Sequence, residues 1–255
     1  MDFLEKILIE KRKEVAQLPI VERKNQAKAY PFYQRVKEHP EKLHVIGEIK
    51  RASPSKGEIN VDVDIVAQAK SYEQAGVSAI SVLTDEVFFK GNMTDLQTVA
   101  KNVQVPVLCK DFIIDEKQLF RAKNAGASMV LLIVAALSFD KLKELHEKAI
   151  ALDLEVLVET HNTEEMEKAH AIDAKIIGVN NRNLKTFIVD IQHSLDLAQP
   201  DDGPIYISES GFVTGEDAKR VAKDYHVILV GETLMRAENP KTKIAELRVS
   251  RHDEN

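Results

Sequence analysis

The sequence contains a single cysteine, Cys109, and no tryptophan. One cysteine cannot form a disulfide within the chain and fits a reducing compartment, so we expect a cytoplasmic protein. No apolar run approaches the roughly 20 residues that cross a bilayer, and the evenly mixed charges at the start are not typical of a signal peptide. The net charge of −6 gives no general basic surface. We therefore expect neither a membrane nor a nucleic acid as partner, and an anionic ligand must be held by local charge and backbone dipoles.

No linker or low-complexity tract divides the 255 residues; instead, short apolar runs alternate with amphipathic, helix-like stretches. The apolar runs number eight: His44–Ile49, Ala79–Leu83, Val105–Cys109, Ser128–Val134, Leu154–Val158, Ile176–Val179, Ile205–Ser208 and Val227–Val230. Such runs suit parallel strands that are covered on both faces. Several of the stretches between them carry a helix start signal, namely Ser138, Asn162 with Glu165, and Thr214 with Asp217. Eight units without a break predict a closed (β/α)8 barrel rather than an open doubly wound sheet.

The predicted fold class is therefore α/β, a TIM barrel of eight parallel strands with one or two extra N-terminal helices. We expect residues 1–255 to form a single domain, in which 1–43 are a helical extension and 44–250 are the barrel. The clearest extra helix spans Phe3–Val15.

Charged residues lie where the first apolar run ends. Glu48 and Lys50 are two residues apart, so their side chains share one face of the strand. If that face points into the barrel, both charges are buried and need each other or a charged ligand. Polar residues also follow five other runs: Lys110-Asp111-Phe112, Glu159-Thr160, Asn180-Asn181-Arg182-Asn183, Glu209-Ser210-Gly211 and Gly231-Glu232. In a barrel these positions surround the C-terminal mouth, where such enzymes place their chemistry, so we predict one site there.

Each of these residues also has a plainer explanation. A Lys or Glu at a strand end is more often a solvated loop residue, but Lys110 and Glu159 directly follow core runs on different strands, which favours a site. Arg182 is either a surface cation or a ligand contact in an Asn-rich loop. Ser210-Gly211 and Gly231 are either ordinary turn residues or a phosphate grip built from backbone N–H groups.

Other reactive or aromatic residues are expected mainly in packing. Six histidines show no metal-ligand spacing and are predicted at the surface or in packing: His44, His146, His161, His170, His193 and His226. Cys109 follows an apolar strand and is expected to be buried and inert. Phe88, Phe89 and Phe112 lie just past strand ends, where they either pack or line a pocket for a substrate ring. The segment Arg51–Ile59, which holds Ser, Pro, Gly and two cations, is predicted to be a mobile lid over an anionic substrate.

The motifs at the strand ends resemble those of one enzyme family. The stretch Glu48–Gly57 (EIKRASPSKG) closely resembles the signature of indole-3-glycerol phosphate synthases, and so does Gly178–Leu184 (GVNNRNL). Further similar segments occur in order between Val45 and Met235: Ser81–Asp85, Phe89–Gly91, Lys110–Ile113, Leu131–Val134, Ser208–Gly211 and Leu229–Glu232. The resemblance implies a phosphate-binding barrel of tryptophan biosynthesis. Its reaction closes a pyrrole ring on an anthranilate-derived ribulose 5-phosphate, with loss of CO2 and water and without a metal or organic cofactor.

The resemblance also assigns roles to residues. The catalytic residues it implies are Lys110, Glu159, Glu48 and Lys50. Lys110 is expected to be the general acid of ring closure, for which it needs a lowered pKa or a tight substrate contact, and Glu159 the base of the dehydration. How the acid roles divide between Lys110 and Lys50 stays open. The residues implied in substrate binding are Asn180, Arg182, Glu209, Phe89, Phe112, Leu131 and Leu184. Those implied in phosphate binding are Ser53, Ser210, Gly211, Gly231 and Glu232, the last standing where some members carry Ser.

Two alternative functions also fit a phosphate-binding barrel. A phosphoribosylanthranilate isomerase is expected to use a Cys/Asp acid–base pair, whereas the first strand here ends on Glu-Ile-Lys. A catalytically silent barrel would keep the phosphate grip and lose the charged residues, yet Glu48, Lys50, Lys110 and Glu159 are all present. We therefore predict an enzyme, a carbon–carbon lyase of the carboxy-lyase type, that acts on a small molecule as a monomer or weak homodimer.

Overall fold

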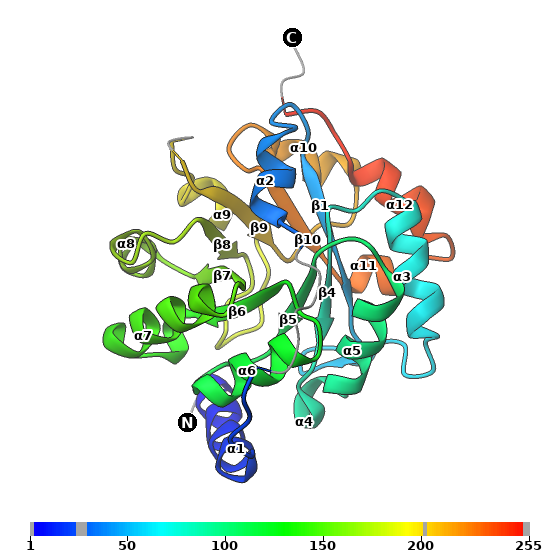
Figure 1. Cartoon of the computed structure of the whole chain (residues 1–255). Helices are drawn as coiled ribbons and strands as arrows, with labels where there is room; N and C mark the ends of the chain where they lie inside the picture. Colours follow the sequence, from blue (N-terminus) through cyan, green and yellow to red (C-terminus); the bar gives the residue numbers. More distant parts are fainter. Residues whose placement is uncertain (1–2, 24–29, 201–202, 252–255) are drawn as a thin grey trace.

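The chain folds into a closed barrel of eight parallel strands in the computed structural model, which describes residues 3–23, 30–200 and 203–251 (Figure 1). The strands are β1 (His44–Ile49), β4 (Ala79–Leu83), β5 (Val107–Lys110), β6 (Met129–Ile133), β7 (Glu155–Thr160), β8 (Ile176–Asn180), β9 (Ile205–Glu209) and β10 (Val227–Val230). Each strand pairs with its neighbours in chain order, and β1 closes the barrel against β10, with His44 opposite Val227. The predicted fold class is confirmed.

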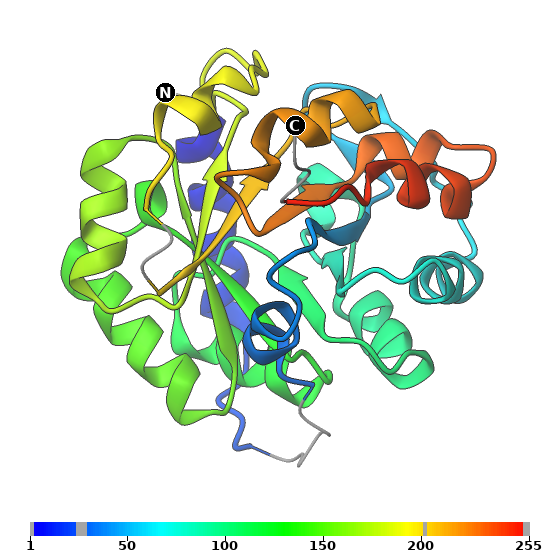
Figure 2. The same cartoon turned by 90° about the horizontal axis from the view of Figure 1, so that it is seen from above.

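Helices surround the barrel and connect its strands (Figures 1 and 2). They are α3 (Ile65–Gln74), α4 (Glu86–Phe89), α5 (Met93–Asn102), α6 (Glu116–Asn124), η1 (Val134–Ala136), α7 (Phe139–Ala151), α8 (Thr163–Ala171), α9 (Gln192–Asp196), α10 (Gly215–Ala222), α11 (Glu232–Arg236) and α12 (Pro240–Leu247). The predicted start signals are confirmed, since the side chains of Ser138, Asn162 and Thr214 each accept a hydrogen bond from a backbone N–H of the first turn. No helix in the described part of the chain is both long and apolar enough to span a membrane.

Side chains alternate between the inside and the outside of the barrel along each strand. On β5, Val107 and Cys109 pack in the outer layer beneath the helices, whereas Leu108 belongs to the cluster inside the barrel. The same period of two residues turns Lys110 inward at the C-terminal end of the strand. The alternation therefore buries the apolar residues in two layers and leaves the strand-end polar side chains facing one another.

Two N-terminal helices, α1 (Phe3–Gln17) and α2 (Phe32–Lys37), lie at opposite ends of the barrel (Figures 1 and 2). α2 is held at the N-terminal end of the strands, where the Glu155 carboxylate accepts hydrogen bonds from the backbone N–H groups of Phe32 and Tyr33 at 2.5 and 2.7 Å. α1 lies at the other end and confirms the helix predicted from Phe3. Residues 1–2 and 24–29 of the predicted extension lie outside the described residues.

The segment predicted as a lid forms a small hairpin over the C-terminal end of the barrel. It consists of β2 (Ala52–Ser53) and β3 (Gly57–Glu58), which pair in antiparallel fashion. The guanidinium of Arg51, just before the hairpin, forms an ion pair with Asp95 of α5. The mobility of this segment stays a prediction.

Candidate active site

A cavity of about 940 Å³ opens at the C-terminal ends of the strands. Every residue predicted for the site lines it: Glu48, Lys50, Ser53, Phe89, Lys110, Phe112, Leu131, Glu159, Asn180, Arg182, Leu184, Glu209, Ser210, Gly211, Gly231 and Glu232. Helix α1 adds Phe3, Leu4 and Ile7 to the wall, which the sequence did not reveal. The volume and the mixture of apolar and charged walls suit a ligand with an aromatic ring and anionic groups.

Lys110 lies between two glutamates at the centre of the cavity. Its Nζ is 3.3 Å from Oε2 of Glu159 and forms a close ion pair with Oε2 of Glu209. Burial alone would lower the pKa of Lys110, but the negative charges of Glu209, Glu159 and Glu48 outweigh it and raise the pKa above its ordinary value. The lowered pKa that an acid could use is therefore not found. Of the two conditions expected for a general acid, a lowered pKa or a tight substrate contact, only the contact then applies to Lys110.

The two glutamates beside Lys110 have different proton affinities. Burial raises the pKa of Glu159, but the charges of Lys110 and His161 and a hydrogen bond from Asn180 Nδ2 to Oε1 at 3.2 Å hold it well below its usual range. Burial also raises the pKa of Glu209, and here the nearby charges of Glu159 and Glu48 help to keep it raised, at about 7, despite Lys110. The surroundings therefore favour an ionised Glu159 at neutral pH and give Glu209 the higher proton affinity of the two.

Two glycines make room for the charged side chains. Glu48 and Lys50 form an ion pair at 2.9 Å beside Gly231, where an added Cβ would lie 2.4 Å from Oε1 of Glu48 and 2.9 Å from Nζ of Lys50. At Gly178 an added Cβ would lie 2.3 Å from Oε1 of Glu209. A side chain at either position would require these charged groups to move, so glycine leaves them the space that they occupy.

The loop after β9 presents its backbone to the cavity. Ser210 and Gly211 both have positive φ, at 71° and 101°, which turns the chain sharply at the end of the strand. The turn is fixed by Asn181, whose Nδ2 donates to the carbonyl oxygen of Ser210 at 3.0 Å, and by Ser210 Oγ, which donates to Oδ1 of Asn180 at 3.0 Å. This region of the cavity, with Gly231 beside it, is the part suited to an anion held by backbone N–H groups.

Aromatic and other apolar side chains form another part of the cavity wall. The rings of Phe89 and Phe112 lie 6.1 Å apart between centroids and line the cavity, whereas Phe88 packs edge-on against Phe3 of α1. Arg182 donates to Ser55 Oγ at 3.2 Å, which joins the loop after β8 to the β2–β3 hairpin.

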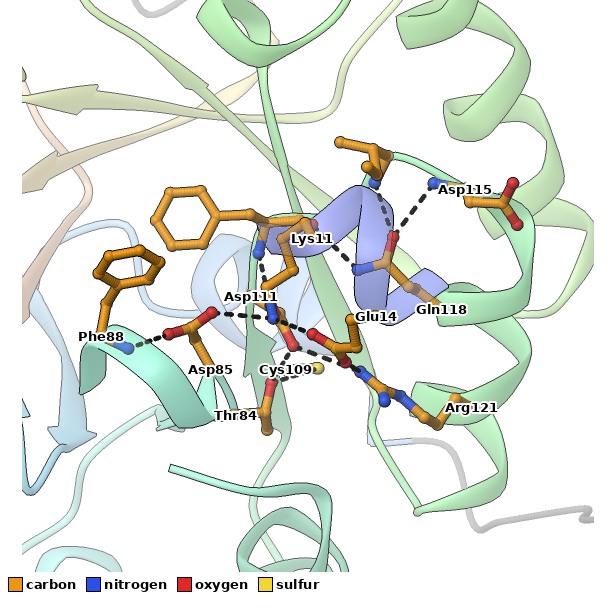
Figure 3. Close-up of polar contacts among 12 residues, drawn as sticks. Lys11, Glu14, Thr84, Asp85, Phe88, Cys109, Asp111, Asp115, Gln118 and Arg121 are labelled. Carbon is orange, nitrogen blue, oxygen red and sulfur yellow. Dashed lines mark hydrogen bonds and ion pairs between the residues drawn. The ribbon is translucent and has the colours of Figure 1, made fainter. Parts of the chain in front are cut away.

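A buried ion cluster fastens α1 to the barrel (Figure 3). Nζ of Lys11, whose side chain is 2% exposed, lies 2.9 Å from Asp85, 2.7 Å from Asp111 and 2.7 Å from Glu14. Thr84 Oγ1 donates to Asp111 at 2.7 Å. The cluster was missed in the sequence because Lys11 is one of several lysines in an amphipathic helix, and no local signal separates it from its exposed neighbours.

His161 also contacts the site, although its spacing in the sequence predicted surface or packing. Its Nε2 lies 3.3 Å from Oε1 of Glu159, and its Nδ1 lies 3.1 Å from Oε2 of Glu165. A signal that points to it is its position two residues after Glu159 and four before Glu165. Cys109 is buried as predicted, and burial raises the pKa of its thiol to about 12, so it is a poor nucleophile. Within residues 3–23, 30–200 and 203–251, no group of three or more His, Cys, Asp or Glu side chains is placed to hold a metal ion.

Comparison with known proteins gives one consistent family. A family model described as indole-3-glycerol phosphate synthase matches residues 4–247. A protein of that name from Listeria welshimeri is 58% identical over 252 residues, which cover 98% of this chain and 100% of the relative. One from Lactococcus lactis subsp. cremoris is 53% identical over 255 residues, covering 99% and 97%.

Solved structures of lower identity share the fold. A 3-hexulose-6-phosphate synthase has a TM-score of 0.63 at 18% identity and covers 80% of this chain and 98% of its own. The tryptophan synthase alpha chain from Legionella pneumophila has a TM-score of 0.61 at 13% identity and covers 85% and 94%. These two structural similarities support only the assignment of the barrel fold. Together with the match over residues 4–247 and the relatives above 50% identity, the strand-end motifs show that the chain belongs to the indole-3-glycerol phosphate synthase family.

Proposed function

We propose that the cavity is where this member of the family converts 1-(2-carboxyphenylamino)-1-deoxyribulose 5-phosphate to indole-3-glycerol phosphate. The activity of the family is that of a carboxy-lyase of tryptophan biosynthesis, and the chain carries it. The observation that best supports the site is the ammonium of Lys110 between Glu159 and Glu209, with the Glu48–Lys50 pair facing the same space. Acid and base groups thus converge on one pocket of suitable size.

Ring closure needs a proton for the ketone oxygen as the aromatic carbon attacks. Lys110 supplies it, because its raised pKa keeps the ammonium fully charged until an oxygen with developing negative charge arrives. In the free protein two of the three N–H donors of the Lys110 ammonium are directed at the glutamates, which leaves the third for the substrate oxygen. Proton transfer is then confined to the bound state.

Decarboxylation follows ring closure and restores the aromatic ring. The substrate carboxylate is positioned by Arg182 and Lys50, whose cationic groups line the cavity, while Asn180 and Glu209 orient the substrate by hydrogen bonds. The apolar wall at Phe89 surrounds the anthranilate ring. Because a carboxylate leaves as neutral CO2, the overall reaction takes up one proton from solution in each turnover.

Dehydration completes the indole. Glu159 is ionised and 3.3 Å from Lys110, so it is suited to remove a proton from the ring-closed intermediate. The departing hydroxyl receives a proton from Lys50, or from Lys110 once that amine has regained a proton from solution. Glu48 holds Lys50 at 2.9 Å and so controls where that ammonium points.

The substrate phosphate binds at the end of the cavity formed by the loops after β9 and β10. Its ligands are the backbone N–H groups around Ser210–Gly211 and Gly231–Glu232, with Ser53 from the hairpin. The Glu232 carboxylate is paired with Arg236 at 3.1 Å, so it is the residue's backbone that serves the anion. Sulfate or phosphate soaked into crystals is expected at this place, and density elsewhere in the cavity would refute the assignment.

Rapid quenching of the reaction tests the roles directly. Glu159→Gln should close the ring but dehydrate slowly, so a decarboxylated, hydroxyl-bearing intermediate should accumulate while indole fluorescence lags. Glu167→Gln, which changes an exposed carboxylate of α8, serves as the matched control and should behave as the unaltered chain. Normal indole formation by Glu159→Gln would refute the assignment of the base.

Three further proposals concern the cellular location, the oligomeric state and the domain organisation. We infer a cytoplasmic location, supported by a buried, unpaired thiol at Cys109. We infer a monomer or weak homodimer, which sedimentation equilibrium would test. We infer that residues 1–255 form one domain with 44–250 as its barrel, which predicts a single cooperative unfolding transition.

A further inference from the structure

His161 contacts Glu159 but is not among the described residues that line the cavity. Among the described residues, Glu159 lines the cavity, whereas His161 and Glu165 do not. The His161 side chain is 13% exposed, and its Nε2 is buried 3.3 Å from Oε1 of Glu159 without an aligned hydrogen bond to any described group. Oε2 of Glu159 faces Lys110 at 3.3 Å, so the carboxylate stands between a cation inside the cavity and an imidazole outside it.

Both ring nitrogens of His161 face carboxylates. Nε2 faces Glu159, and Nδ1 lies 3.1 Å from Oε2 of Glu165 at the start of α8. A neutral imidazole has a lone pair on one nitrogen, which would be directed at one of these oxygens, so the arrangement favours the doubly protonated ring. Burial lowers the pKa of His161, but the two carboxylates outweigh it and raise the pKa to about 10. The placement of the two carboxylates and this shift both favour a cationic ring at neutral pH.

The position of the ring is itself held. The backbone N–H of His161 donates to Oε2 of Glu165 at 2.8 Å, and Asn162 Nδ2 donates to Oε1 of the same carboxylate at 2.9 Å. On the other side, Nε2 of His193 from α9 lies 2.9 Å from the carbonyl oxygen of His161. The charged and titratable groups that face the Glu159–His161 pair are thus Lys110 from β5, Glu209 from β9, Glu165 from α8 and His193 from α9.

We propose that His161 is a positioning residue that keeps Glu159 an oriented carboxylate while Lys110 is without its proton. The inference rests on the proposed role of Glu159 as the base of dehydration. When Lys110 gives its proton to the substrate, Glu159 loses the positive charge on its cavity side. Burial then favours protonated Glu159, which cannot act as a base. His161 lies outside the cavity and does not take part in that proton transfer, so its charge stays beside Glu159 throughout the turnover.

The test is the pH dependence of kcat in His161→Gln. Glutamine has a side-chain amide that donates to a carboxylate but carries no charge. A cation within a few ångströms of a carboxylate lowers its pKa by about 1–3 units, so the acid limb of kcat should move to higher pH by about one unit or more. At pH values below the acid limb, kcat of His161→Gln should be lower than that of the unaltered chain by a factor of about ten or more. On the high-pH plateau the two values should agree within a few-fold. A purely structural role would lower kcat by the same factor at every pH.

Glu165→Gln gives a second, gentler perturbation. It removes the outer carboxylate, lowers the pKa of His161, and should move the acid limb in the same direction as His161→Gln, but less far. Glu164→Gln is the matched control, because it removes a charge one residue away that is paired with Lys168 and does not face His161. Its profile should coincide with that of the unaltered chain.

The protonation state of His161 is measured independently of activity by ¹⁵N NMR of the histidine rings. Both nitrogens of His161 should carry protons at pH values near 8, above the ordinary pKa of about 6.5. A neutral ring there, or a His161→Gln profile that superimposes on the original after scaling, would overturn the inference. If Glu159→Gln turned over normally, the proposed base would be wrong, whereas a defect in Glu159→Gln with an unshifted His161→Gln profile would refute the role of His161 alone.

Discussion

Replacing Lys11 with methionine should leave two buried carboxylates beneath α1 without their cationic partner. Methionine fills nearly the same volume, but it leaves Asp85 and Asp111, both 2% exposed, without the ammonium that lies 2.9 and 2.7 Å from them. Removing one partner of a buried ion pair costs about 3–5 kcal/mol. The raised pKa of Lys11 means that its stabilisation is complete below its ordinary pKa of 10.5 and is lost only as pH rises through the folded value, so measurements near neutrality record all of it.

The loss of stabilisation can affect the whole chain or α1 alone, and each outcome can be measured. If the whole chain is destabilised, the free energy of unfolding measured in urea should fall by about 3–5 kcal/mol. The Tm should then fall by roughly 6–10 °C, at about 2 °C per kcal/mol for a chain of this size. If α1 detaches alone, its amides should lose hydrogen-exchange protection. In that case KM should rise, because Phe3, Leu4 and Ile7 leave the cavity wall.

Lys13→Met is the control for this prediction. Lys13 lies on the same helix, is 64% exposed and is paired with Glu10 at 2.7 Å. Its removal should cost no more than about 1 kcal/mol. Adding Asp85→Asn to Lys11→Met should recover part of the lost stability, because one of the two unpaired buried charges is then removed. A Lys11→Met chain as stable as Lys13→Met, with α1 equally protected, would refute the reasoning.

Three other predictions concern the barrel and its mouth. Cys109→Ala should lower stability by about 1 kcal/mol in urea unfolding and leave kcat nearly unchanged, because the thiol packs in the outer layer; a large loss of kcat would contradict this. Burial raises the pKa of Glu209 from 4.5 to about 7, so the folded chain keeps a proton that the unfolded chain has released, and stability should fall between those pH values. Glu209→Gln should remove that part of the slope, and an unchanged slope would refute it. Gly231→Ala should displace Glu48 and Lys50, and a KM or kcat close to the original would show that their places are not constrained.

Much of the fold follows from the sequence because parallel strands are apolar on both faces. The runs His44–Ile49, Ala79–Leu83 and Val227–Val230 have the bounds of β1, β4 and β10. The predicted run from Val105 begins two residues before β5, since Pro106 lacks the N–H that a ladder requires. The hairpin Ala52–Glu58 was not predicted, because its Pro, Ser and Gly residues also suit an irregular loop.

The candidate site was predicted where the side chains lie on the strands themselves. A period of two residues is sufficient to turn Glu48, Lys110 and Glu159 toward one axis, so spacing alone brings them together. The contacts of Lys11 with Asp85 and Asp111 depend instead on how α1 docks on the barrel. That docking is a long-range packing result, which the sequence neighbours of Lys11 do not encode, whereas His161 lies near both of its carboxylate partners in the sequence.

The claim that Lys110 is the acid of ring closure is tested most directly by the rate of indole fluorescence from the carboxyphenylamino substrate in Lys110→Met. General acid–base groups contribute about 10²–10⁴-fold, so turnover should fall by at least about two decades while circular dichroism and anion binding stay nearly as in the unaltered chain. Lys50→Met, measured in parallel, should raise KM more than it lowers kcat. Near-normal turnover by Lys110→Met together with loss of turnover in Lys50→Met would contradict the account and make Lys50 the principal acid.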